Sequence, residues 1–149
     1  MMKDKAFIPK LLGYLGLLPV IVPTVLLFLD KHHPAIWAHF IITYAAIILS
    51  FVGALHWAFA MTINQASKLD KQFGFIWSVN PSLIAWMSLL INHFFASILL
   101  AIFFILNLAK DKNLPKNFDL PEWYLSLRTR LTYIVTICLV VAATHFKTL

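Results

Sequence analysis

The chain is a succession of long apolar runs separated by short polar segments. The runs, and with them five predicted membrane spans, cover residues 9–29, 37–63, 73–91, 94–109 and 129–146. A helix crosses the hydrocarbon core of a bilayer with roughly 20 residues at about 1.5 Å each. Only the fourth run falls short of this length. The pattern therefore predicts an all-α fold: one integral membrane domain over residues 1–149, built as a bundle of five transmembrane helices.

Two boundaries depend on a few polar residues. Asn92 and His93 are the only polar pair between the third and fourth runs. A single helix over 73–109 would be about 55 Å long, nearly twice the hydrocarbon thickness, so we expect a tight hairpin at this pair. Before the fifth run, the stretch from Trp123 to Arg130 combines aromatic and basic side chains. Such a mixture is typical of the membrane interface and predicts a short interfacial helix before the last span.

The basic residues favour the same five spans. This arrangement puts ten of the twelve Lys and Arg residues on one side of the membrane, leaving Lys31 and Lys147 on the other. By the positive-inside rule, the N-terminus is cytoplasmic and the C-terminus lies on the opposite side. The first run lacks a small-residue cleavage site, which predicts a retained span rather than a signal peptide. Since no Arg-rich presequence precedes it, we expect a bacterial inner (cytoplasmic) membrane.

Composition agrees with lipid as the surrounding solvent. Hydrophobic residues make up 61% of the chain and charged residues 12%, whereas a soluble domain carries roughly 25% charged residues. The net charge of +6 is spread over the short segments between the runs, so we expect contacts with anionic lipid head groups and no nucleic-acid partner. The single cysteine, Cys138, excludes a disulfide within one chain.

Polar and kink-forming residues inside the predicted spans form a candidate ligand site. His56 lies near the inner end of the second span, beside a face of small and polar residues. Pro81 kinks the third span next to Asn80. These residues have a purely structural interpretation as packing contacts. The alternative is a pocket for a ligand with a polar head, with the candidate residues Ser50, His56, Trp57, Asn80, Pro81 and Trp86.

Evidence for catalytic or metal chemistry is absent from the sequence. No Asp, Glu, Lys or Arg falls in the interior of a predicted span, since Lys10 and Arg130 stand at the ends of the first and last, and this argues against an ion-coupled transporter. Five of the six histidines map to the outer half, but no carboxylate cluster accompanies them. We predict no catalytic residue, no metal site and no cofactor. Haem held by His39 with His93 or His145, or a bound quinone, stays open as an alternative.

Four segments in order carry a resemblance. They are Leu-Gly-Leu-Leu-Pro at 15–19, the run 44–53 continuing to His56-Trp57, Asn-Pro-Ser-Leu-Ile-Ala-Trp at 80–86, and Trp-Tyr-Leu-Ser-Leu-Arg at 123–128 closing with Leu131-Thr132. Together they resemble a family of small five-span membrane proteins, domain of unknown function 3429, whose eukaryotic relative is transmembrane protein 69. The resemblance implies the fold and the membrane location. It supplies no activity.

Three functions are compatible with these observations. The first is a non-enzymatic membrane subunit or assembly factor that docks another membrane protein, or a second copy of itself, through Trp123, Tyr124 and Arg128. The second is a binder of a quinone, porphyrin or lipid in an intramembrane pocket. The third is a membrane enzyme or transporter that depends on histidine.

Overall fold

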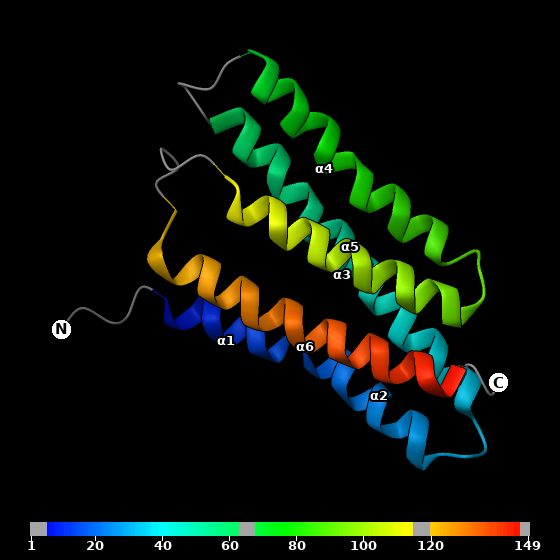
Figure 1. Ribbon diagram of the computed structural model, residues 1–149. Coiled ribbons are helices and arrows are strands. Elements are labelled where there is room, and N and C mark those ends of the chain that lie inside the picture. Colours follow the sequence, from blue (N-terminus) through cyan, green and yellow to red (C-terminus); the bar gives the residue numbers. More distant parts are fainter. Residues whose placement is uncertain (1–5, 63–67, 115–119, 147–149) are drawn as a thin grey trace.

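The chain folds into helices that run back and forth along one another (Figure 1). The computed structural model describes residues 6–62, 68–114 and 120–146, and no strand occurs within these ranges. Short turns or the segments between the described ranges join most helices, so successive helices pack as antiparallel neighbours. The helices are α1 (Phe7–Leu15), α2 (Leu18–Leu29), α3 (Pro34–Thr62), α4 (Lys68–Ser88), α5 (His93–Lys112) and α6 (Glu122–Phe146).

α1 and α2 form one broken rod. The break falls at Gly16 and Leu17, and Pro19 stands in the first turn of α2, where its missing N–H needs no partner. The Tyr44 hydroxyl of α3 donates a hydrogen bond to the Gly16 carbonyl oxygen at 2.6 Å. This bond holds the break against α3, and α1 and α2 both contact α6.

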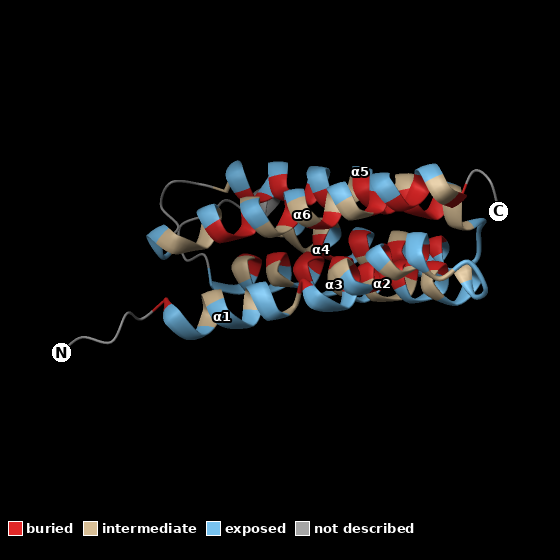
Figure 2. Ribbon diagram, turned by 90° about the horizontal axis from the view of Figure 1, so that it is seen from below, coloured by how far each residue is buried: buried red, intermediate tan, exposed pale blue. Residues whose placement is uncertain are grey.

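The described helices include four that are long and apolar enough to cross a membrane. They are Phe7–Leu29 (α1 with α2), Pro34–Thr62, His93–Lys112 and Glu122–Phe146. α4 packs along α3 but is less apolar. Figure 2 shows buried residues on the inward sides of the helices and exposed residues outside. Many large hydrophobic side chains, such as Phe51 and Phe95, are on the outside, as expected for a membrane protein in contact with lipid.

Side chains that cap or brace the turns explain where the helices end. Asp30 accepts hydrogen bonds from the His32 backbone N–H at 3.0 Å and from the Trp37 indole N–H at 3.0 Å. These bonds close the turn between α2 and α3. At the other hairpin, the Asn92 side chain accepts from the Phe94 backbone N–H at 2.9 Å and caps α5. The turn predicted at Asn92-His93 is therefore present.

α3 and α4 approach each other closely at Gly53. Gly53 of α3 faces the ring of Pro81, and a Cβ placed on Gly53 would lie 2.6 Å from the Pro81 Cβ. Only glycine admits such an approach, and it lets α4 pack closely on α3 at Pro81. The centre of the bundle is mainly aliphatic, with the buried rings of Phe104 and Phe146, and its fully buried members include Leu27, Ile41, Leu49, Leu100, Phe104 and Leu139.

Two expectations need correction. The stretch from Trp123 to Arg130 is not a separate interfacial helix, because α6 runs without a break from Glu122 to Phe146. α5 continues three residues beyond the predicted end at Ala109, as far as Lys112. Asp111 and Arg128 are buried and lie inside helices that are long and apolar enough to be spans, two residues and one residue outside the predicted spans 94–109 and 129–146. The prediction that no charged residue lies in the interior of a span therefore applies only to those narrower bounds.

Candidate functional site

An ion pair is buried where α3, α5 and α6 meet. The Arg128 guanidinium contacts one carboxylate oxygen of Asp111 twice, with Nη2 at 2.8 Å and Nε at 2.9 Å from Oδ2. The other carboxylate oxygen, Oδ1, lies 3.3 Å from His56 Nε2. Asp111 is 1% exposed, His56 5% and Arg128 7%. With a neutral imidazole, the usual form at pH 7, this cluster carries no net charge, which makes its burial tolerable.

Helix spacing explains how the polar groups come together. Asn107 precedes Asp111 by one turn of α5, so both lie on its inward face. Asn107 is fully buried, and its side-chain oxygen accepts from the Trp77 indole N–H of α4 at 3.2 Å. Lys110 lies over the outer side of the same indole, 4.8 Å from the ring centroid. α4 is thus tied to the helix that carries the carboxylate.

Aromatic rings cover the ion pair on the side of Tyr124. The Phe59 ring stands edge-on to both Tyr124 and His56, with centroid distances of 6.0 Å and 5.9 Å. Tyr124 belongs to the first turn of α6, its hydroxyl oxygen is buried, and it lies close to Arg128 and Asp111. The rings exclude water from this end of the bundle and strengthen the electrostatic contacts within it.

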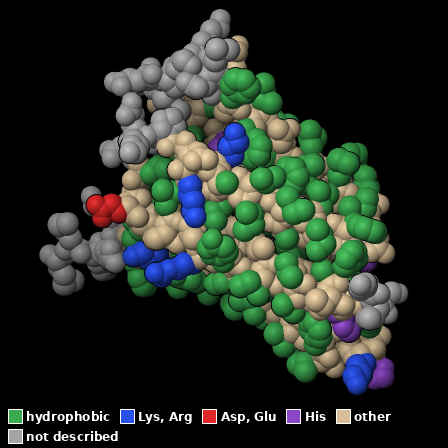
Figure 3. Space-filling view, viewed as in Figure 1, with side chains coloured by type: hydrophobic (Ala, Val, Ile, Leu, Met, Phe, Trp, Pro, Cys, Tyr) green, Lys and Arg blue, Asp and Glu red, His purple; other side chains and the backbone are tan. Residues whose placement is uncertain are grey.

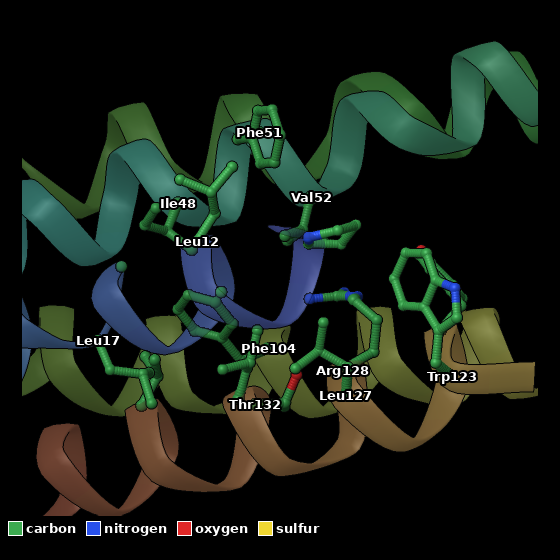
Figure 4. A pocket seen from close by; sticks show the side chains of 16 residues that line it. Leu12, Leu17, Ile48, Phe51, Val52, Phe104, Trp123, Leu127, Arg128 and Thr132 are labelled. Carbon is green, nitrogen blue, oxygen red and sulfur yellow. The ribbon is translucent and has the colours of Figure 1, made fainter. Parts of the chain in front are cut away.

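A cavity of about 400 Å³ adjoins the ion pair. α1, α3, α5 and α6 line it, and most of its wall is aliphatic or aromatic. Figure 4 shows the Arg128 side chain reaching from α6 into this space, with the Trp123 ring beside it. The polar side chains in the wall all come from α6. The residues that α6 contributes to the wall are Trp123, Tyr124, Leu127, Arg128, Leu131, Thr132 and Val135.

The cavity lies beside the break between α1 and α2, where Gly16 and Leu17 line it. α1 contacts α6, whereas the Tyr44 hydrogen bond holds only the junction at Gly16 close to α3. Beyond that junction the space between α1 and α3 is left open. Leu12 of α1 and Phe51 of α3 border it and are 62% and 63% exposed. The cavity is thus open at the side of the bundle, between exposed apolar side chains.

The six predicted ligand-binding residues do not meet in one place, and none lines the cavity. His56 is bound to the buried carboxylate, and Pro81 packs on Gly53. Trp57 and Trp86 are exposed at 46% and 60%, and Trp57 stacks edge-on with Phe75. Asn80 is also exposed and Ser50 is half-buried. Of this set, only His56 belongs to the polar cluster that the structure reveals.

The three predicted docking residues are brought together, but they turn inward. Trp123 and Tyr124 are half-buried and line the cavity with Arg128. Arg128 forms an ion pair with Asp111 and exposes little surface to a partner protein. Sequence reasoning missed Asp111 and Thr132 as members of this site. The available signals were the four-residue spacings Asn107–Asp111 and Arg128–Thr132, each of which puts polar groups on one helix face.

A cluster of metal ligands is not assembled in the part of the chain described. No group of three or more His, Cys, Asp or Glu residues lies close enough there to hold a metal ion. Among the histidines considered for haem, His93 lies against Phe146 and close enough to His39 for an electrostatic interaction, whereas His145 lies against Phe28. The wall of the cavity itself contains no histidine, cysteine or methionine.

Comparison with known proteins places the chain in a family. It is 30% identical to transmembrane protein 69 of Xenopus tropicalis over 130 residues, and 25% identical to the Mus musculus protein of that name over 126 residues. These alignments cover 87% and 85% of this chain but 51% of each relative, so the chain spans about half their length. No solved structure matches it significantly. Residues 6–144 match the family described as protein of unknown function (DUF3429), and the chain therefore belongs to this family of membrane proteins.

Proposed function

We propose that this protein is a five-pass integral membrane protein that binds a hydrophobic small molecule in the cavity between α1, α3 and α6. The observation that supports the proposal most is the cavity itself. Its volume of about 400 Å³ falls within the range of known small-molecule sites, which run from roughly 300 to 1,000 Å³. Like those sites, it combines a mostly apolar wall with a few convergent polar groups.

In this proposal α4 also crosses the membrane, in addition to the four apolar helices. Its 21 residues correspond to about 31 Å, the thickness of the hydrocarbon core. Figure 1 shows it running beside α3 in the opposite direction. The polar residues that lower its hydropathy are partly turned inward, since Ser78 and Ser88 are buried, whereas Phe73 and Leu83 are exposed. α4 therefore presents an apolar face to lipid.

Charge supports an orientation for the five passes. Figure 3 shows Lys and Arg side chains gathered toward the end of the bundle where α1 and α6 begin, and hydrophobic side chains over its middle. With this end in the cytoplasm, the N-terminus is cytoplasmic and the C-terminus lies across the membrane. A bacterial inner membrane remains our proposed location for this chain.

The side chains in the cavity wall favour some classes of ligand over others. Porphyrin, quinone and lipid were the three expected classes. Haem iron needs an axial ligand, commonly histidine, cysteine or methionine, and the wall offers only Tyr124 among residues that can serve. A quinone or a lipid needs only apolar surface for its tail and hydrogen-bonding groups for its head, both of which the wall provides.

Two other functions have weaker support. A subunit that docks a partner protein stays a prediction, but Trp123, Tyr124 and Arg128 are engaged by the cavity and the ion pair rather than displayed outside. A histidine-dependent enzyme or transporter would need His56 to reach its substrate. His56 does not line the cavity and is already paired with Asp111.

The test is native mass spectrometry, with an absorption spectrum, of the protein gently extracted from its host membranes. We expect the 17.0 kDa chain with a reproducible added mass from a quinone or lipid. In Val52→Phe, a new ring enters the cavity from α3 and the added mass should disappear. Ile47→Phe puts the same ring on the exposed side of α3 and should retain it. A stoichiometric second polypeptide without any added small mass would instead favour the docking function.

A further inference from the structure

The cavity wall contains a hydroxyl group that lacks a hydrogen-bonding partner. Thr132 lines the cavity and is 1% exposed, and its hydroxyl makes no hydrogen bond with any described residue. A buried hydroxyl without a partner costs free energy, and a ligand head that accepts its proton removes this cost. One helical turn earlier, the Arg128 guanidinium reaches into the same space, with the buried Tyr124 hydroxyl nearby (Figure 4).

The charge on this side of the cavity is already balanced. Asp111 neutralises Arg128 through the contacts at 2.8 Å and 2.9 Å. A carboxylate or phosphate head placed here would add an uncompensated negative charge to a buried, water-poor site, which is strongly unfavourable. A neutral head with oxygen acceptors avoids this penalty and still uses the donors of Thr132, Tyr124 and Arg128.

The opening to lipid restricts the rest of the ligand. The cavity opens between Leu12 and Phe51, both highly exposed, at the gap between α1 and α3. A molecule with its head near Thr132 therefore extends its apolar part past these two side chains into the bilayer. Its tail can be longer than the cavity, because the surplus remains in lipid.

From these observations we infer that the occupant is a neutral amphiphile with a carbonyl or ester head, drawn sideways from the bilayer and held by hydrogen bonds from Thr132 and its neighbours on α6. This chemistry is shared by isoprenoid quinones and acylglycerols. The inference rests on the proposed function, since it specifies the head group of the molecule that the cavity takes.

The experiment measures thermal unfolding of the full chain in detergent micelles with increasing amounts of three probes. These are a benzoquinone with a decyl tail, dioctanoylglycerol and decanoic acid. A ligand that binds the folded state stabilises it by an amount that grows with the logarithm of its concentration relative to Kd, so the rise in Tm with concentration gives an apparent Kd for each probe. We expect stabilisation by at least one neutral probe and a weaker effect of decanoate at neutral pH. The neutral probe that raises the Tm shows whether the ligand is a quinone or an acylglycerol.

Matched variants localise the effect. Thr132→Val keeps the shape of the side chain and should weaken the neutral probe about 3- to 10-fold, the effect of one lost hydrogen bond. Thr136→Val removes another buried hydroxyl one turn along α6, away from the cavity wall, and should leave the affinity unchanged. Val52→Phe should abolish stabilisation by every probe, and Ile47→Phe should not.

Two failures are distinguishable. If decanoate binds more tightly than both neutral probes, or if Thr132→Val equals Thr136→Val, while Val52→Phe still abolishes binding, the neutral-head inference is overturned and the cavity remains a binding site. If no probe stabilises the parent protein, or if Val52→Phe binds as Ile47→Phe does, the proposed function is overturned together with the inference.

Discussion

Arg128 and Asp111 join α6 to α5 inside the bundle, with Nη2 of the guanidinium 2.8 Å from Oδ2 of the carboxylate. The pair lies within helices that qualify as membrane spans. Ionisable residues are expensive in such positions and are usually paired and turned to the interior. Here the pair also holds the guanidinium in the wall of the cavity. Its loss should therefore affect both stability and ligand binding.

Arg128→Met should strongly destabilise the fold. The substitution leaves the Asp111 carboxylate buried with His56 as its remaining close partner, and breaking one side of a buried ion pair costs about 3–5 kcal/mol. The free energy of unfolding, measured with increasing SDS in mixed micelles, should fall by this amount. Arg130→Met removes the same charge from an exposed position two residues further on and should have a small effect.

Replacing both Asp111 and Arg128 measures how much the two side chains stabilise each other. Asp111→Leu combined with Arg128→Met leaves no isolated charge, so the double variant should be more stable than Arg128→Met alone. Strictly additive losses, or a single variant that unfolds like Arg130→Met, would show that the two side chains do not stabilise each other.

Gly53→Ala should loosen the contact between α3 and α4. The new Cβ would lie 2.6 Å from the Pro81 Cβ, and neither a helix backbone nor a proline ring can move aside easily. We expect a loss of about 1–3 kcal/mol, typical of overpacking. Gly13→Ala is the control, because its Cβ would meet the end of the Leu131 side chain at 3.0 Å, which can rotate away. Equal stability of both variants would contradict the contact.

Much of the helical arrangement could be predicted from the sequence because lipid imposes simple rules. The length of each apolar run shows how many transmembrane helices it can form. A polar pair such as Asn92-His93 marks the turn between two of them. Four apolar spans emerge in the structure. The α4 segment is harder, because part of its polar content is buried against other helices and lowers the hydropathy that a sequence window measures.

The candidate site could not be predicted in the same way. Asp111 stands between Lys110 and Lys112 in the sequence and has the character of a loop residue. Its burial depends on α5 continuing past the last apolar residue and on Arg128, 17 positions away, lying opposite. The cavity lies beside the junction at Gly16, which the Tyr44 hydroxyl holds against α3. Both are tertiary contacts, which hydrophobic periodicity does not encode.

The turn between α2 and α3 should become less stable in acid. The hydrogen bond from the Trp37 indole, followed by that from the His32 backbone, lowers the pKa of Asp30 below its usual value of 3.8. A carboxyl group with a lowered pKa in the folded state stabilises that state above its unfolded pKa, and this contribution is lost as the pH falls through the folded pKa. Asp30→Asn should therefore melt below the parent protein at neutral pH.

Thermal melts across the acid range check this sign. The difference in Tm between the parent and Asp30→Asn should shrink as the pH falls below 3.8. Lys31→Gln, at the exposed neighbouring position, should show no such convergence. A difference that stays constant with pH would mean that the ionised form of Asp30 does not brace the turn.

Whether α4 crosses the membrane can be determined by cysteine labelling. In a Cys138→Ala background, single cysteines replace Lys31 in the turn before α3, Ile91 in the turn before α5, and Asn113 just after α5, all exposed positions. With five passes, an impermeant thiol reagent applied to spheroplasts should label Lys31→Cys and Ile91→Cys, and should reach Asn113→Cys only after permeabilisation. If α4 does not cross, the reagent should label Asn113→Cys in intact spheroplasts and should reach Ile91→Cys only after permeabilisation. The lysines around α1 and the start of α4 would then no longer share a side with Lys110, Lys112 and Arg130, and the charge asymmetry that supports the orientation would be lost.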